Sequence, residues 1–300
     1  MDPAIAIFGF GIGLLVGMTG MGGASLMTPL LILVFGIEPV TAIGTDLFYG
    51  AVTKTAGAWR HLKHGTVHRA MSFWLAVGSV PAAIGGVFVI EYLQNHYGED
   101  EVKNLILGML GATLLVVGVA TLLRAFFLTA QIPERAAMHM YRRHIIGAII
   151  TGAITGFVIG LTSAGSGTLI AIALILIFRL TPQRVVGTDI FHAAVLLWAA
   201  GLAHWIGGNV DMVLAANILI GSVPGVLIGS SLAVRAPQSL LRPALGIVLC
   251  ASAITLLLKY GTAEVVIPSL SVATLVIGAI LITQVLINRH YRQQRVPAPA

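Results

Sequence analysis

Long uninterrupted runs of apolar residues, separated by short polar segments, dominate the chain. Seven runs approach or exceed the roughly 20 residues that a helix needs to cross a bilayer core. They are residues 41–59, 70–92, 104–128, 185–206, 212–233, 240–258 and 265–287. Strands of an outer-membrane barrel would instead alternate apolar and polar positions over about ten residues. The pattern therefore predicts an all-α membrane protein.

Two further stretches each contain two shorter apolar runs joined by a glycine-rich polar linker. The first joins 4–18 to 24–36, and the second joins 147–161 to 168–178. Lipid cannot satisfy the N–H and C=O groups of non-helical backbone, so such backbone must be buried in protein or line a wet cavity. We therefore expect two broken helix pairs, either re-entrant or fully spanning, with their linkers inside the protein.

Composition narrows the class further. Charged residues make up 9% of the chain and hydrophobic residues 57%, with a mean hydropathy of +0.97, whereas soluble domains average about 25% charged residues. This excludes a soluble enzyme, a nucleic-acid binder and a disordered protein, and makes the lipid bilayer the expected partner. The single cysteine, Cys250, lies in an apolar run, so no disulfide and no cysteine-based metal site is expected. No other metal or cofactor is expected.

The chain contains an internal repeat at an offset of 143 residues. Gly13–Gly86 aligns without gaps on Gly156–Gly229, with 25 identities in 74 positions. Apolar composition alone would not place Gly, Pro, Asp and His in register. We predict a first repeat over 1–128, a linker over 129–144, a second repeat over 145–259, an extra transmembrane helix over 260–288 and a tail over 289–300.

Each repeat contains an odd number of crossings, so the two should have inverted topologies. The positive-inside rule tests this independently. With the C-terminus inside, the inner segments contain 14 of the 17 Lys and Arg residues, and the outer segments contain eight of the eleven acidic residues. The charges thus predict an outside N-terminus, a cytoplasmic C-terminus and a cytoplasmic 129–144 linker.

Inverted repeats with broken, glycine-rich segments at equivalent positions are typical of secondary transporters. The linkers offer backbone N–H groups, hydroxyl groups and the partly positive N-termini of the following helices. Donors without acidic residues favour an anion over a cation. The candidate substrate-binding residues of the linkers are Thr19, Gly20, Gly22, Gly23, Ser25, Thr162, Ser163, Gly165, Ser166, Gly167 and Thr168. The alternative is that these glycines only allow close helix packing, as the stripes Gly9/Gly13/Gly17 and Gly152/Gly156/Gly160 do.

Three charged residues fall within predicted spans: Asp46, Lys54 and Asp189. Intramembrane charges are costly and mark function by default. Lys54 aligns with Leu197 in the repeat and is therefore not part of the scaffold that both repeats share. We add it to the candidate substrate-binding residues. The alternative is that its side chain reaches the nearby interface. For Asp46 and Asp189 we expect one of two roles: each carboxylate stabilises the start of its helix, or it couples protons to transport. His192 follows Asp189 by three residues and is a third candidate for proton coupling.

Several motifs together resemble the sulfite exporter TauE/SafE family. In the first half, the motifs are Gly17-Met-Thr-Gly-Met-Gly-Gly-Ala-Ser-Leu-Met-Thr-Pro29, Ala42-Ile-Gly-Thr-Asp46, and Arg60-His61 followed by Gly65-Thr-Val67. In the second half, they are Thr162-Ser-Ala-Gly-Ser-Gly167, Val186-Gly-Thr-Asp189, and His204 followed by Gly208-Asn-Val-Asp211. The resemblance implies an inner-membrane carrier that exports small sulfur-containing anions such as sulfite or organosulfonates. It also places the substrate at Thr19–Ser25 and Thr162–Thr168.

Two other functions stay open at the level of sequence. A passive channel for small anions would use the same linkers without alternating access. An intramembrane serine hydrolase would need Ser166, within Gly165-Ser-Gly167, to pair with His192 or His204. A homodimer is a candidate assembly.

Overall fold

The computed structural model describes residues 3–19, 24–126, 140–232 and 238–260, and these residues form ten helices. The helices are α1 (Pro3–Thr19), α2 (Ala24–Phe35), α3 (Pro39–Lys63), α4 (Arg69–His96), α5 (Glu99–Phe126), α6 (Arg142–Thr162), α7 (Leu169–Leu176), α8 (Pro182–Ile206), α9 (Met212–Leu232) and α10 (Gln238–Tyr260). The predicted all-α class is confirmed. The predicted helix 265–287 lies outside the described residues.

Within the described part of the chain, five helices are long and apolar enough to cross a membrane: α4, α5, α6, α8 and α9. The sequence pattern predicted only half a broken pair at 147–161, but α6 begins at Arg142 and its 21 residues can cross alone. Its broken partner α7 has only 8 residues. The 25-residue α3 falls outside the five because it carries polar residues, several of them buried inside the bundle. The apolar part of α10, Pro243–Leu258, is shorter than a full span.

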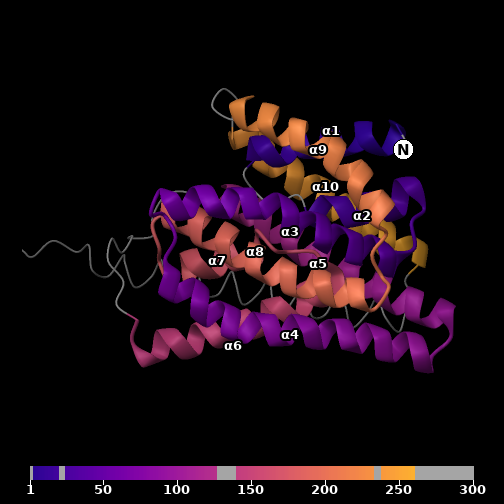
Figure 1. The fold of residues 1–300 in the computed structure, drawn as a ribbon, viewed down its shortest axis with the longest axis horizontal. Coiled ribbons are helices and arrows are strands. Elements are labelled where there is room, and N and C mark those ends of the chain that lie inside the picture. The colour runs from indigo at the N-terminus through magenta and orange to yellow at the C-terminus, as the bar shows by residue number, and fades with distance from the viewer. Residues whose placement is uncertain (1–2, 20–23, 127–139, 233–237, 261–300) are drawn as a thin grey trace, which may run out of the picture.

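The helices pair between the two halves of the chain (Figure 1). α1 packs against α9, α4 against α6, α5 against α10 and α3 against α8. Each pair takes one helix from before residue 127 and one from after residue 139. In Figure 1, α4 and α6 run together along the lower edge, while α1 and α9 lie together near the top. The halves are therefore interleaved around α3 and α8.

Contacts between glycines and facing backbone recur at the 143-residue offset. A Cβ atom on Gly13 of α1 would collide with the backbone of Ser222 on α9, and one on Gly156 of α6 would collide with Ser79 on α4. Ser79 and Ser222 are themselves 143 residues apart. The prediction that these glycine stripes serve close packing is confirmed, because only hydrogen fits between the paired helices.

Two threonines of the repeated Gly-Thr-Asp motif hold helix starts in the opposite half. Thr188 Oγ1 accepts from His68 N before α4 at 2.9 Å, and Thr45 Oγ1 accepts from Asp211 N before α9 at 3.0 Å. Backbone N–H groups at helix starts lack intrahelical partners, so these bonds satisfy donors that lipid could not. The motif therefore joins each half to the other.

Gly13 and Gly11 of α1 provide a matched test of this packing. We expect Gly13→Ala to lower the free energy of unfolding by at least about 1–3 kcal/mol, since its methyl group overlaps backbone that cannot move aside. Gly11→Ala meets nothing within 4 Å, and should be neutral or stabilise slightly because alanine favours helix. Unfolding of both purified variants in detergent checks the difference, and equal stabilities would contradict the close approach of α1 and α9.

Candidate functional site

The second linker, residues 163–168 between α6 and α7, is buried throughout. Ser163 ends α6 in the left-handed conformation at φ 56°, and its N–H donates to Ile159 O. Gly165 follows at φ 97°, a region that residues with a Cβ rarely adopt. Two positive φ values within three residues turn the chain sharply between α6 and α7. Such backbone persists where the surrounding structure enforces it, which is typical of functional sites.

Lys54 reaches this linker from α3. Its Nζ donates to the backbone oxygen of Ser166 at 2.9 Å and to Ser166 Oγ at 3.0 Å. The side chain is 8% exposed and therefore does not extend to the interface near Arg60. Within the described residues, Lys54 forms no ion pair with Asp46 of α3 or with Asp189 of α8. A buried ammonium group is thus bound to neutral oxygen atoms of the linker.

Asp46, two turns before Lys54 on α3, joins the start of the same linker to α2. Its Oδ2 atom lies 2.7 Å from Thr28 Oγ1 and 2.9 Å from Ser163 Oγ. The two hydroxyl oxygens lie 2.6 Å from each other. Asp46 is fully buried, and its Oδ1 atom has no hydrogen-bond partner among the described residues. Glu38, not Asp46, caps the start of α3 by accepting from Thr41 N, so Asp46 braces other elements instead.

A direct bond connects the regions around the two predicted linkers. Gly165 N donates to Ser25 Oγ, in the first turn of α2, at 3.0 Å. Ser25, like the 163–168 segment, is buried. The structure therefore brings Ser25, Lys54, Ser163, Gly165 and Ser166 together.

Other predicted substrate-binding residues differ in their surroundings. Thr162 is buried, but its hydroxyl donates to Val158 O on its own helix, so its proton is already used. Gly167 and Thr168 are buried within the turn that leads into α7. Thr19 ends α1. The side chain of Thr19 and the whole of residues 20–23, including Gly20, Gly22 and Gly23, lie outside the described residues.

The histidines considered for chemistry bond elsewhere. His192 Nε2 lies 2.8 Å from Ser79 Oγ on α4, and His204 Nε2 lies 3.0 Å from Gly160 O on α6. Ser166 instead bonds to Lys54. Asp189 is buried, and its Oδ1 atom has no hydrogen-bond partner within the described part of the chain. The serine–histidine pair that a hydrolase would need at Ser166 is therefore not formed in the described structure.

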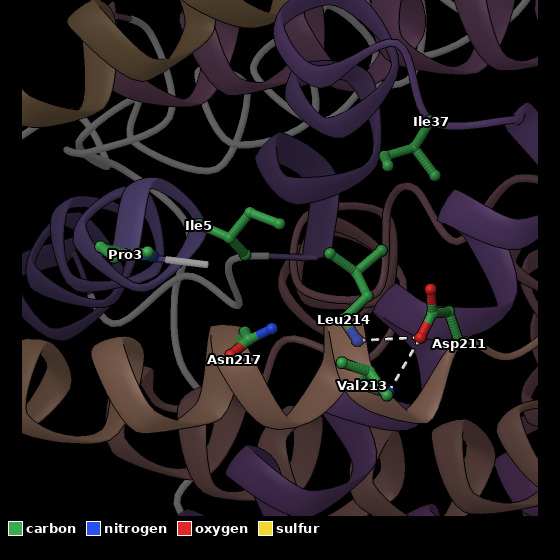
Figure 2. Close-up of a pocket in the computed structure, with 7 residues that line it drawn as sticks. All are labelled: Pro3, Ile5, Ile37, Asp211, Val213, Leu214 and Asn217. Carbon is green, nitrogen blue, oxygen red and sulfur yellow. Dashed lines mark hydrogen bonds between the residues drawn. The ribbon is translucent and has the colours of Figure 1, made fainter. Parts of the chain in front are cut away.

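A separate hollow of about 540 Å³ lies between α1, α9 and the segment before α3. Figure 2 shows its lining, which combines Pro3, Ile5, Ile37, Val213, Leu214 and Asn217 with one carboxylate, Asp211. Asp211 Oδ1 accepts from Val213 N and Leu214 N, both at 2.9 Å, and so caps α9 (Figure 2). None of the predicted site residues lines this hollow, so it is distinct from the linker region.

The sequence reasoning missed three kinds of polar contact. Thr28 is the second hydroxyl on Asp46, yet it lies inside an apolar run and aligns with Ala171. Ser79 bonds to His192 from a different helix. Thr45 and Thr188 brace helix starts across the halves. The duplicated Gly-Thr-Asp motif could have identified the last pair. Thr28 lies in the motif that ends at Pro29, but the second repeat has Ala171 at its position, so the repeat does not single it out.

The fold and the site together define a class of protein: a multi-pass α-helical membrane protein with a buried polar linker against a buried lysine. The chain belongs to the sulfite exporter TauE/SafE family, whose model matches residues 5–256. It is a membrane transporter of that family.

Similar proteins carry transporter names without a substrate. The probable membrane transporter protein YjnA of Bacillus subtilis is 41% identical over 235 residues, which cover 78% of this chain and 91% of that protein. The probable membrane transporter protein YdhB of the same organism is 31% identical over 238 residues, covering 79% and 92%. A probable membrane transporter protein of Xylella fastidiosa (strain Temecula1) is 29% identical, covering 81% and 90%. No solved structure matches the chain significantly.

Proposed function

We propose that this protein is a secondary transporter that exports a small sulfur-containing anion, such as sulfite or an organosulfonate, by alternating access. The observation that carries the proposal is the buried contact of Lys54 with Ser166. An ammonium group inside a membrane protein is costly unless it is neutralised. Here it is held by a carbonyl and a hydroxyl oxygen, which an incoming anion can replace.

The chemistry of the linker favours an anion. Segment 163–168 contains two serines, a threonine, two glycines and no acidic residue. Its backbone N–H groups and hydroxyls lie at the start of α7, where the helix dipole is positive. A sulfite or sulfonate group offers three oxygen acceptors, which Lys54 Nζ, Ser166 Oγ and exposed N–H groups of an opened linker would bind. We leave Thr162 out of this set, because its hydroxyl donates to Val158 O.

The described conformation fits the closed state of an alternating-access cycle. Ser163 and Ser166 are 0% exposed, and Lys54 holds the linker against α3. We propose that the segments 1–128 and 145–259 are inverted repeats, and that exchange between their two arrangements opens the linker to each side in turn. The equivalent contacts at the 143-residue offset support a shared architecture of the two repeats.

The proposed orientation follows from charge. With 14 of 17 basic residues in the inner segments, we place the C-terminus in the cytoplasm, the N-terminus outside, and the protein in the cell inner membrane. The family's description as sulfite exporter supports both the substrate class and the outward direction. A homodimer is compatible with this arrangement.

Uptake into proteoliposomes tests the proposal. We expect labelled sulfite, thiosulfate or a short sulfonate to accumulate with saturable kinetics, and unlabelled substrate inside the vesicles to accelerate uptake by counterflow. Sulfate, which has one more oxygen atom than sulfite, serves as the comparison anion. Flux that rises linearly with concentration and shows no counterflow would indicate a passive channel. Absence of any flux of these anions by folded protein would refute the carrier.

A further inference from the structure

The hydroxyl and carboxyl oxygens of Thr28, Asp46 and Ser163 form a closed triangle, and all three of its sides can be hydrogen bonds only when Asp46 carries a proton. The three sides are 2.7, 2.9 and 2.6 Å long, and each length is that of an O–H···O hydrogen bond. Three such bonds need three protons. The two hydroxyl groups supply one each, so an ionised Asp46 would leave one pair of oxygens in contact with no proton between them.

We propose that Asp46 carries a proton in this closed conformation and that loss of the proton releases the 163–168 linker. In the protonated triangle, Thr28 donates to Asp46 Oδ2, the acid O–H donates to Ser163 Oγ, and Ser163 donates back to Thr28. Ser163 is the first residue of the linker, so the acid proton ties the linker to both α2 and α3. The proposal deepens the proposed function, because the linker is the region assigned to the substrate.

The burial of Asp46 supports the same protonation state. Oδ1 is buried and has no hydrogen-bond partner in the described structure. An ionised carboxylate would place part of a full charge on this bare atom, whereas a neutral acid leaves only a carbonyl oxygen there, which costs much less. Lys54 does not neutralise Asp46 by contact, because its Nζ bonds to Ser166.

The charged and titratable groups around Asp46 come from several helices. On α3 they are Lys54 and Tyr49; on α8 they are Asp189, His192 and His204; Asp211 precedes α9, and on α5 Glu99, Asp100, Glu101, Lys103 and Arg124 lie towards the ends. The described part of α2, which supplies Thr28, contains no titratable side chain. Lys54 is the buried cation on the same helix, two turns further along. Its positive charge favours ionisation once the triangle opens, so proton release and linker release reinforce each other.

The proton balance is simple. Asp46 takes one proton from water as the triangle closes and returns one proton to water as it opens. Closure is therefore favoured at low pH and opening at high pH. A linker that opens only after this proton has left connects the pH on the exposed side to substrate exchange at Lys54 and Ser166.

Infrared spectroscopy of the full-length protein in detergent tests the protonation state without any transport. We expect a carbonyl-stretch band of a protonated carboxyl group at pH 7, shifted to lower frequency in D2O. The part of this band that comes from Asp46 should be lost in Asp46→Asn and should persist in the matched control Asp189→Asn, which changes the equivalent position of α8. A wild-type spectrum without the band, or a band unchanged in Asp46→Asn, would overturn the proposal.

A second measurement tests the same proton without Asp46→Asn, in case that variant does not fold. Protein labelled with carboxyl-13C aspartate, in the Asp189→Asn background, should show the band at an isotope-shifted frequency. Asp100 and Asp211 are exposed to solvent, whereas Asp46 is buried, so a shifted band from a buried carboxyl group reports Asp46. No isotope-sensitive band in that background would refute the protonated acid.

Sulfite counterflow provides the functional readout. We expect the wild-type rate to rise several-fold between pH 6 and pH 8, and the Asp46→Asn rate to be low and nearly independent of pH, because an amide supplies the third proton permanently. Titration of sulfite itself affects both proteins equally, so the ratio of their rates isolates Asp46. Identical profiles would refute the pH-dependent release. Absence of counterflow in the wild type would instead refute the proposed function, while leaving the infrared result to decide on the proton.

Discussion

Lys54→Met should raise the KM for sulfite by roughly 10- to 100-fold while the protein keeps its fold. The side chain supplies the only buried cation found near the 163–168 linker in the described structure, and a hydrogen bond from a charged group is worth about 1.5–3 kcal/mol. Methionine fills a similar volume without the charge. Its introduction also removes the desolvation cost of a buried ammonium group, so stability should change little.

Two variants accompany Lys54→Met in the proteoliposome assay. Leu197→Met changes the equivalent, buried position of α8 and should transport like the wild type. Lys54→Arg keeps the charge but replaces a compact ammonium group by a planar fork, so it should retain part of the activity. A folded Lys54→Met protein with a wild-type KM would show that the anion binds elsewhere.

Gly165→Ala should destabilise the protein by about 1–3 kcal/mol, the usual cost of an unfavourable backbone conformation, and should strongly reduce transport. The residue lies at φ 97°, and an added Cβ would lie 2.8 Å from Leu169 Cδ1. Its N–H also donates to Ser25 Oγ, so any rotation of this peptide to relieve the strain breaks the bond that links α2 to the linker.

Gly147→Ala on α6 is the matched control for Gly165→Ala. Its Cβ would make ordinary contacts of 3.8 Å with the Phe178 ring, and its helical backbone suits alanine. In detergent, Gly165→Ala should have a lower free energy of unfolding than Gly147→Ala, and in proteoliposomes it should have a lower rate of sulfite counterflow. Equal stability and equal transport would mean that the linker backbone is not held as described.

The local sequence pattern was sufficient to predict the class of protein and several residues of the candidate site. Apolar runs predicted all-α membrane architecture, and four of the five span-length helices, α4, α5, α8 and α9, follow predicted runs. The glycine stripes predicted close packing, which the Gly13–Ser222 and Gly156–Ser79 contacts confirm. The sequence also predicts both Lys54 and Ser166 as candidate site residues. These features are local or repeated, and can therefore be found by reading along the chain.

The pairing of helices could not be predicted in the same way. A transmembrane helix is apolar on nearly all sides, because lipid and protein interior are equally apolar, so hydropathy does not show which face meets which neighbour. Only the structure revealed that α1 pairs with α9 and α4 with α6 across the two halves. The continuous α6 was missed for a related reason: its first turn contains Arg142 and Arg143, which lower the local hydropathy without ending the helix.

The sequence by itself determined that this is a multi-pass membrane transporter with an internal sequence repeat, glycine-rich linkers and three charged residues in predicted spans. The tertiary structure decided what those charges contact. Thr28 and Ser163 are 135 residues apart, and Lys54 and Ser166 are 112 apart, so their bonds exist only because folding brings α2, α3 and the linker together. Hydrogen bonds between hydroxyl, carboxyl and ammonium groups depend on distances of a few tenths of an ångström. Such distances are set by the packing of whole helices, and no periodicity along the chain encodes them.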